Sequence, residues 1–298
     1  MATEYLPNER TTALLATGLI KLGNKTINYY REGPLGAPAI VFTHGMGLSD
    51  RYFDDLISHL GLCNRYCLHR FDYDGHGLSP VFDATPSTVE SYAADLAALF
   101  HHANLTSNVV LISHSLGCFV SMQAALTAPN VAKATKALIL LNSPALPMSP
   151  PGLYGCQQRI EIIKNKGIAG TIKAIVDLDI APKESAKCSQ SRNEAISKLT
   201  NALSVTSDCG FSRANQAVVA WGSRDMCLED LTCKALLITG DKDMVGAPSQ
   251  TMQMARRMAN AEVVILDGVG HHPVWEDIST TGQLIDTFLK SCWNIVSL

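Results

Sequence analysis

The chain has 298 residues, of which 47% are hydrophobic and 17% are charged, and its formal net charge is −3. A chain of this size can bury one large core, or one core with a small subdomain, so we expect a compact soluble protein. The weak negative charge, without any cluster of Lys and Arg, argues against nucleic acid and anionic membranes as partners.

The N-terminus and the cysteines bear on cellular location. Residues 1–24 carry scattered charges rather than a signal-peptide pattern, and no apolar run approaches the length of a membrane span. The nine cysteines form an odd set without a Cys-x-x-Cys pair. This usage favours reduced, buried thiols over a disulfide framework or a zinc site. We therefore expect a cytoplasmic protein without a metal or cofactor.

The first half of the chain predicts alternating strands and helices. Apolar and polar positions alternate over residues 18–30 around a Gly23-Asn24 turn, which indicates an antiparallel hairpin. Continuous apolar runs typical of buried parallel strands follow at residues 37–42, 66–71, 108–111 and 136–141. Helices are expected between them over residues 49–62, 87–103 and 118–125.

The pattern changes between residues 147 and 230. Prolines cluster at the start, and helical patterns follow without convincing strands: two short helices over residues 159–177, and another over 214–221. Strands resume at 235–238 and 262–266, with helices over 249–259 and 282–296. We expect an α/β core formed by residues 1–146 and 231–298, with a mostly parallel sheet, and a helical cap at 147–230.

Ser115 is the candidate nucleophile. It lies between the apolar run at 108–111 and the predicted helix at 118–125, and a serine on such a strand-to-helix turn presents its hydroxyl to substrate. The usual pattern there is Gly-x-Ser-x-Gly, but Ser113 occupies the first glycine position. A serine at this place is also common as an ordinary helix cap, so the assignment depends on partners elsewhere.

Two later loops supply those partners. Both follow predicted strands; one contains Asp241 and Asp243, and the other contains the adjacent pair His271 and His272. Attack by a serine hydroxyl needs a neutral imidazole to accept its proton and a carboxylate to orient that imidazole. The residue types therefore suit nucleophilic catalysis, although the pattern alone leaves either aspartate and either histidine possible. An unperturbed imidazole base would give a pH midpoint of roughly 6 to 7.

These motifs together resemble the α/β-hydrolase superfamily over nearly the whole chain. The resemblance rests on residues 44–47 (His-Gly-Met-Gly), 72–79, the turn at Ser115, 240–243 and 268–271. It implies an eight-stranded, mostly parallel sheet flanked by helices. It also favours Asp243 as the acid and His271 as the base, and implies an oxyanion hole made by the backbone N–H groups of Met46 and Leu116.

Within the superfamily, residues 159–174 and 211–230 are similar to the cap of 3-oxoadipate enol-lactonases and related esterases. Such a cap would enclose a small or medium-sized organic molecule in a mostly apolar pocket. The candidate pocket residues are His44, His114, Trp221 and His272. Each of them has a competing structural interpretation: His44 as a brace of its loop, His114 as a side chain turned into the sheet, and His272 and Trp221 as packing residues.

The sequence thus predicts a cofactor-independent serine hydrolase that cleaves an ester or lactone through an acyl-enzyme, with a small molecule as its partner. Three alternatives use the same residues: C–C bond hydrolysis, a non-hydrolytic cyclisation or isomerisation, and a ligand receptor with slow turnover. The sequence does not name the substrate. It also leaves the oligomeric state undecided, with a homodimer as one candidate.

Overall fold

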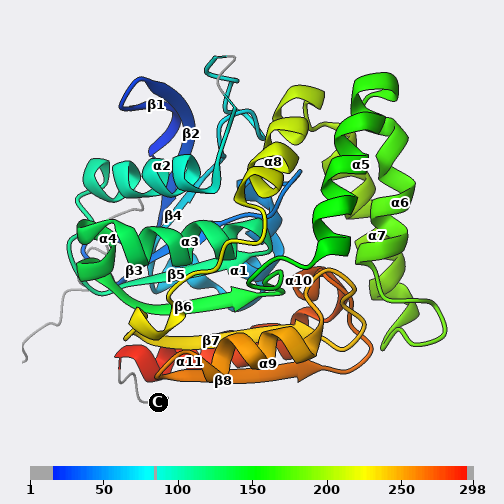
Figure 1. Cartoon of the computed structure of the whole chain (residues 1–298). Helices are drawn as coiled ribbons and strands as arrows, with labels where there is room; N and C mark the ends of the chain where they lie inside the picture. The colour runs from blue at the N-terminus through cyan, green and yellow to red at the C-terminus, as the bar shows by residue number, and fades with distance from the viewer. Residues whose placement is uncertain (1–15, 84–85, 294–298) are drawn as a thin grey trace, which may run out of the picture.

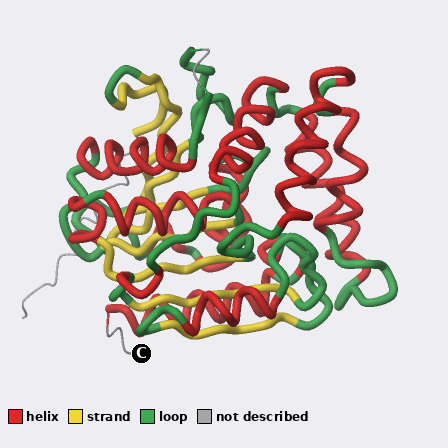
Figure 2. Tube along the Cα trace, in the orientation of Figure 1, coloured by secondary structure: helices red, strands yellow, loops and turns green. Residues whose placement is uncertain are grey.

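The computed structural model describes residues 16–83 and 86–293 and is built around one twisted eight-stranded sheet (Figures 1 and 2). The strand order is β1-β2-β4-β3-β5-β6-β7-β8. The β1–β2 and β2–β4 pairs are antiparallel, and all the other pairs are parallel. The strands are β1 (Ala16–Leu22), β2 (Lys25–Glu32), β3 (Ala39–Thr43), β4 (Cys67–Phe71), β5 (Val109–His114), β6 (Thr135–Leu141), β7 (Lys234–Gly240) and β8 (Ala261–Leu266).

The central strands are apolar at nearly every position because both faces of the sheet are covered. Along β5, Val109 and Leu111 pack into one hydrophobic cluster, while Val110 and Ile112 pack into the cluster on the opposite face. Side chains alternate between the faces of a strand, so a continuous apolar run identifies a strand that is buried on both sides.

Seven α-helices of the described chain flank this sheet outside the cap. They are α1 (Asp54–Leu60), α2 (Val89–His102), α3 (Leu116–Thr127), α4 (Pro129–Ala134), α9 (Pro248–Arg256), α10 (Pro273–Glu276) and α11 (Ile278–Trp293). Helices α2, α3 and α9 contribute to one cluster, and α1 and α11 to the other. Three short 3₁₀ turns complete the set, at Asp50–Phe53, Leu62–Asn64 and Leu228–Asp230.

The helical cap lies between β6 and β7. It comprises α5 (Pro150–Lys166), α6 (Ala169–Asp179), α7 (Ser189–Ser204) and α8 (Asp208–Trp221). In Figure 1, α5, α6 and α7 stand beyond the ends of the strands at the right of the view, and α8 lies between them and the rest of the molecule. An ion pair of 2.8 Å between buried Arg213 of α8 and buried Asp74 ties the cap to the core.

The predicted fold class and the predicted strands are confirmed. The hairpin turns at Gly23-Asn24, and the helix predicted from residue 87 begins with a reciprocal capping box between Thr88 and Ser91. At the start of the helix predicted from residue 49, Ser49 makes no side-chain cap bond, and Asp72 accepts the Asp50 N–H at 2.8 Å instead.

Several helix boundaries also differ. The segment predicted as one helix over 49–62 is divided, because Gly61 adopts a left-handed conformation (φ 57°) that ends α1. Of the two cap helices predicted within 159–177, the first starts earlier, at Pro150, and the second ends later, at Asp179, with the break between them at Gly167 (φ 66°). Helix α7 lies in the predicted helical region but had no range of its own, and residues 294–296 of the last predicted helix lie outside the described residues.

In the part of the chain that the structure describes, no helix combines the length and apolar character required to cross a bilayer.

Candidate active site

Ser115 sits on a strained turn between β5 and α3. Its backbone has φ 51° and ψ −120°, a conformation that costs a non-glycine residue energy and is typical of functional turns. Its N–H donates to the Leu141 carbonyl at 3.0 Å, which fixes the turn against β6. Gly117 must lack a side chain, since a Cβ there would lie 2.2 Å from the Thr43 carbonyl oxygen. Close approach of α3 to β3 thus holds the serine at the sheet edge.

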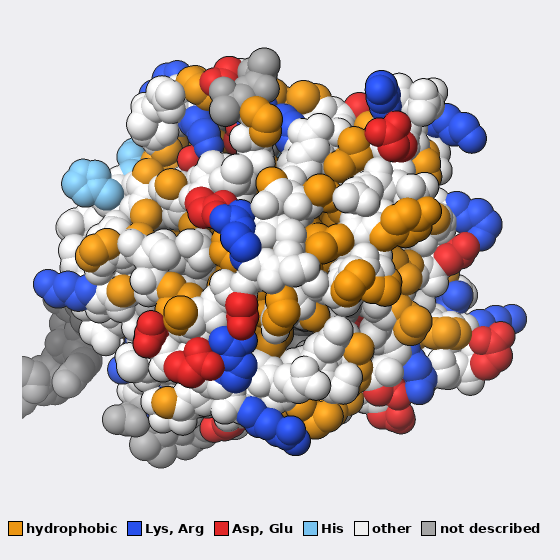
Figure 3. Space-filling model, viewed as in Figure 1, with side chains coloured by type: hydrophobic (Ala, Val, Ile, Leu, Met, Phe, Trp, Pro, Cys, Tyr) orange, Lys and Arg blue, Asp and Glu red, His pale blue; other side chains and the backbone are white. Residues whose placement is uncertain are grey.

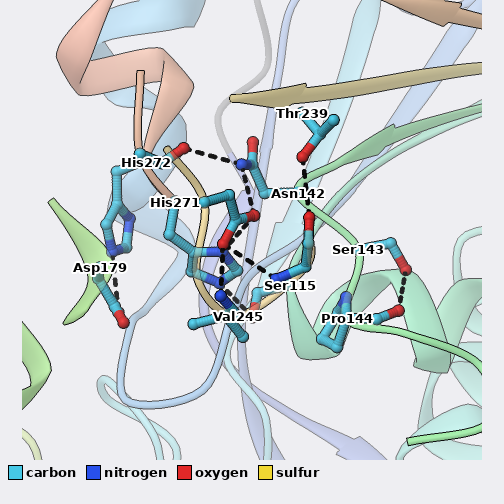
Figure 4. Close-up of polar contacts among 12 residues, drawn as sticks. Ser115, Asn142, Ser143, Pro144, Asp179, Thr239, Val245, His271 and His272 are labelled. Carbon is cyan, nitrogen blue, oxygen red and sulfur yellow. Dashed lines mark hydrogen bonds and ion pairs between the residues drawn. The ribbon is translucent and has the colours of Figure 1, made fainter. Parts of the chain in front are cut away.

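A continuous hydrogen-bond chain runs from Ser115 to Asp243 (Figure 4). His271 Nε2 lies 2.9 Å from Ser115 Oγ, and His271 Nδ1 lies 3.0 Å from both carboxylate oxygens of Asp243. The three residues come from the ends of β5, β7 and β8, which are separated widely in sequence. Parallel strands bring them to one edge of the sheet.

Asp243 is fixed by a set of donors that includes one residue the sequence analysis missed. Its Oδ1 accepts the backbone N–H groups of Val245 and Gly246 at 2.8 and 3.0 Å. Its Oδ2 accepts the side-chain amide of Asn142 at 2.8 Å, and the same amide nitrogen donates to the Gly270 carbonyl at 2.9 Å. Asn142 directly follows β6, so its position at a strand end was the signal that could have identified it.

Glu276 holds the loop that carries His271. This buried carboxylate accepts the N–H groups of Gly270 and His272, both at 3.0 Å, and of Ala181 in the cap at 2.9 Å. The His271 N–H donates to the backbone oxygen of Asp179 at 2.6 Å. The histidine loop is therefore bonded directly to the end of cap helix α6. Sequence reasoning found neither Glu276 nor Asp179.

The carboxylates around His271 control its protonation. Burial disfavours the imidazolium, but the attraction and hydrogen bonding of Asp243, with the charges of Asp179 and Glu276, outweigh it and raise the pKa of His271 to about 9. Asp243 shows the reciprocal effect: burial opposes its charge, but its bonds to His271 and its donors lower its pKa overall. The expected pH midpoint therefore moves to the alkaline side of the 6 to 7 of an unperturbed imidazole.

Ser115 and His271 open onto a cavity of about 340 Å³ between the core and the cap. We call its core side the cavity floor, defined by Met46, His114, Ser115, Leu116 and His271. We call its opposite side the cap wall, defined by Arg159, Ile175, Leu199, Leu203, Phe211 and Val218. Most lining side chains are apolar, so the cavity suits an organic molecule with few polar groups.

Two of the four predicted pocket residues line this cavity, and two do not. His114 and His272 are lining residues; His114 Nε2 bonds the His271 carbonyl oxygen at 2.8 Å. His44 is buried beneath its loop, where it bonds the Gly45 carbonyl and the Tyr73 N–H, and burial lowers its pKa to about 4. Trp221 packs in the core beside Phe119. The pocket assignment of His44 and Trp221 is corrected accordingly.

The competing acid and base candidates occupy different places. Asp241 accepts the Gly268 N–H at 2.7 Å and pairs with Lys242 at the surface side of its turn. His272 turns its Nε2 toward Asp179, 3.4 Å away, as Figure 4 shows. In the structure it is Asp243 and His271 that connect to Ser115.

The remaining groups near the serine turn have structural partners. The Ser113 hydroxyl is buried and donates to Ser121 Oγ at 2.8 Å, which in turn lies 3.0 Å from Thr43 Oγ1.

Burial raises the pKa of the Cys118 thiol, which disfavours a thiolate. Met46 and Leu116, whose N–H groups are the expected oxyanion donors, line the same cavity as Ser115. Across residues 16–83 and 86–293, no group of three or more potential metal ligands was found.

The family model described as "Alpha/beta hydrolase family" matches residues 40–278. This chain belongs to the alpha/beta hydrolase family. It is 24% identical over 85% of its length to the proline iminopeptidase PfmaB of Pestalotiopsis fici, covering 92% of that protein. It is 25% identical over the same share to a pimeloyl-[acyl-carrier protein] methyl ester esterase of Xanthomonas campestris, covering 96% of it.

The structure of this α/β hydrolase is similar to that of the enol-lactonase from Burkholderia xenovorans, with a TM-score of 0.79 and 19% sequence identity. The match covers 92% of this chain and all of the enol-lactonase chain. At this level of identity, the likeness concerns the fold.

Proposed function

We propose that this protein is a serine hydrolase that cleaves a carboxylic ester or lactone of a small to medium-sized organic molecule through an acyl-enzyme. The observation that carries the proposal is the hydrogen-bond chain from Ser115 through His271 to Asp243 at the side of an apolar cavity. Family membership and the similarity to an esterase support the reaction class.

In the first half of the reaction, Ser115 Oγ attacks the carbonyl carbon while His271 Nε2 accepts its proton. Asp243 holds the imidazole by its Nδ1 side and stabilises the imidazolium. The backbone N–H groups of Met46 and Leu116 receive the developing oxyanion, and one such donor is typically worth about 3 to 4 kcal/mol. Collapse breaks the ester C–O bond, and the leaving oxygen takes the proton from His271.

In the second half, a water molecule attacks the acyl-enzyme. His271 accepts the water proton and then returns a proton to Ser115 Oγ, which leaves as the hydroxyl. The products are a carboxylic acid and an alcohol, or one hydroxy acid when the substrate is a lactone. No cofactor enters either half.

The experiment is an activity screen over p-nitrophenyl esters, small lactones and enol-lactones with the purified wild type and Ser115→Ala. We expect turnover by the wild type, incorporation of solvent oxygen from labelled water into the acid, and loss of at least about a thousandfold in kcat in the variant. Circular dichroism checks that the variant is folded. Equal hydrolysis by a folded Ser115→Ala protein would exclude the proposed nucleophile.

We also propose that the enzyme acts in the cytoplasm. All nine cysteines are free thiols in the structure, and such usage is typical of reducing compartments. Fractionation of cells that express the full chain tests this, and recovery in the secreted fraction would contradict it.

A further inference from the structure

The cap wall carries one strong cation among its apolar side chains. Arg159, on α5, is the one Lys or Arg among the described residues that line the cavity. Its neighbours in the lining include Phe211, Val218 and Leu203, which offer it no charge. A half-buried guanidinium loses part of its hydration, and it recovers that free energy only by pairing with an anion or by strong hydrogen bonds.

The protein orients this guanidinium without neutralising it. Arg159 Nε donates to Asn215 Oδ1 at 2.8 Å, and Nη2 lies 3.1 Å from Cys156 Sγ. Asn215 is fully buried in α8 and is itself fixed by a 2.8 Å bond to the Phe211 carbonyl. Both partners are neutral.

The described residues provide no carboxylate for Arg159. None of their Asp or Glu side chains comes within 4.0 Å of its guanidinium, and Nη1 makes no hydrogen bond among them. The carboxylate in the cavity lining, Asp179, lies 3.4 Å from His272 instead. The positive charge of Arg159 and the N–H donors of its Nη1 are therefore available to a molecule in the cavity.

We propose that Arg159 binds an anionic group of the substrate, so that the substrate is an ester or lactone that also carries a carboxylate. A guanidinium presents parallel N–H donors that match the two oxygens of a carboxylate, and such charge-assisted bonds gain strength in an apolar site. The reacting carbonyl lies over Ser115 on the cavity floor, and the carboxylate lies at the α5–α8 side of the cap wall. This inference rests on the proposed hydrolase function.

The test compares matched charged and neutral substrates. One pair places the charge in the acyl part: the p-nitrophenyl monoester of glutaric acid against that of glutaramic acid. The other pair places it in the alcohol part: the butyrate ester of 3-hydroxypropanoic acid against that of its amide. Within each pair, the carboxylate is replaced by a neutral amide of nearly the same shape.

For at least one pair, we expect the wild type to prefer the charged member in kcat/KM, and Arg159→Gln to lower that preference about 10- to 100-fold through KM. Arg159→Lys should recover part of it, because it keeps the charge but loses the fork. Lys164→Gln is the matched control. It removes the same charge from an exposed position of the same helix, and it should leave the preference unchanged.

A second variant keeps Arg159 in place, in case Arg159→Gln fails to fold. Asn215→Asp sets a carboxylate against Nε, neutralises the guanidinium, and should also lower the preference for the charged substrates. If Arg159→Gln hydrolyses both pairs with the wild-type preference, the inference is overturned, even though hydrolysis of the neutral esters still supports the serine hydrolase. If the wild type hydrolyses none of these esters, charged or neutral, the result counts against the proposed function itself.

Discussion

On the cavity floor, His271 beside Ser115 is bonded to a carboxylate, whereas on the cap wall Arg159 has no charged partner among the described residues. His271 is bonded to Asp243 and to the Asp179 carbonyl, and Glu276 accepts the N–H of the preceding Gly270. Among the residues that the structure describes, Arg159 is bonded only to Asn215 and Cys156, which are neutral. A histidine held in one orientation beside Ser115 suits one reaction, while a cation without a charged partner on the wall can bind a substrate.

The surface around the cavity adds to this contrast. Leu178 and Met244 line the cavity and are also exposed, at 38% and 73% of their surface. Figure 3 shows apolar side chains spread over the side of the molecule that carries the cap helices α5 and α8. The cap wall itself is also mainly apolar, so the proposed effect of the single Arg159 charge on ligand preference acts in surroundings that screen it weakly.

The largest expected effect separates two adjacent histidines of the site. His271→Asn should lower kcat at least about a thousandfold for every substrate, because it removes the proposed general base. His272→Asn removes an imidazole one residue away that does not contact Ser115, so it should retain most of kcat. Steady-state rates on a neutral p-nitrophenyl ester measure both. Similar losses in the two variants would mean that the base was assigned wrongly.

A smaller effect is expected at Glu276, which positions the His271 loop without touching Ser115. Glu276→Gln replaces one of the two acceptor oxygens by an NH2 group, which cannot accept a backbone N–H, so the loop should shift. We expect kcat to fall about tenfold, with KM little changed, since misplacement of a catalytic group reduces the rate. Glu262→Gln is the matched control, because it makes the same change of charge at an exposed position on β8. An unchanged kcat in Glu276→Gln would refute the positioning role.

Asp179 should affect the pH profile more than the rate. The proton-accepting form of His271 predominates only above its pKa of about 9, so the rate should rise with pH toward that value. Asp179 is one of the charges that raise this pKa, and Asp179→Asn should therefore move the rising limb to lower pH. Asp177→Asn, two residues earlier on the exposed side of α6, should leave the limb in place. The measurement is kcat/KM as a function of pH. If the rising limb of Asp179→Asn lies at the same pH as that of the wild type, the charge of Asp179 does not raise the pKa of His271.

The smallest effect is expected at Ser113. Ser113→Gly removes one buried hydrogen bond, but Ser121 keeps its contact with Thr43. We expect nearly unchanged kcat and a loss of about 1 kcal/mol in the free energy of unfolding, measured by urea denaturation. A loss of activity comparable to that of Ser115→Ala would instead give the Ser113 hydroxyl a catalytic role.

The sequence by itself determined the sheet and the order of its three site loops. Runs such as residues 108–111 are apolar at every position because both faces of β5 are covered, and that pattern is visible without coordinates. The strand ends then predicted loops at Ser115, Asp243 and His271 that parallel topology brings together. The resemblance to the α/β hydrolases chose between Asp241 and Asp243 and between His271 and His272.

Only the tertiary structure decided what surrounds those loops. Asn142, Asp179 and Glu276 each form a hydrogen bond to a segment far away in the chain, and no local pattern records those long-range bonds. His44 and Trp221 have side chains suited to a pocket, but the packing of their helix or loop turns them into the core. Arg159 became informative only when folding placed it in an apolar wall with Asn215 and without a carboxylate. Local sequence encodes the periodicity of burial, whereas the partner of a charged group depends on which distant segments meet.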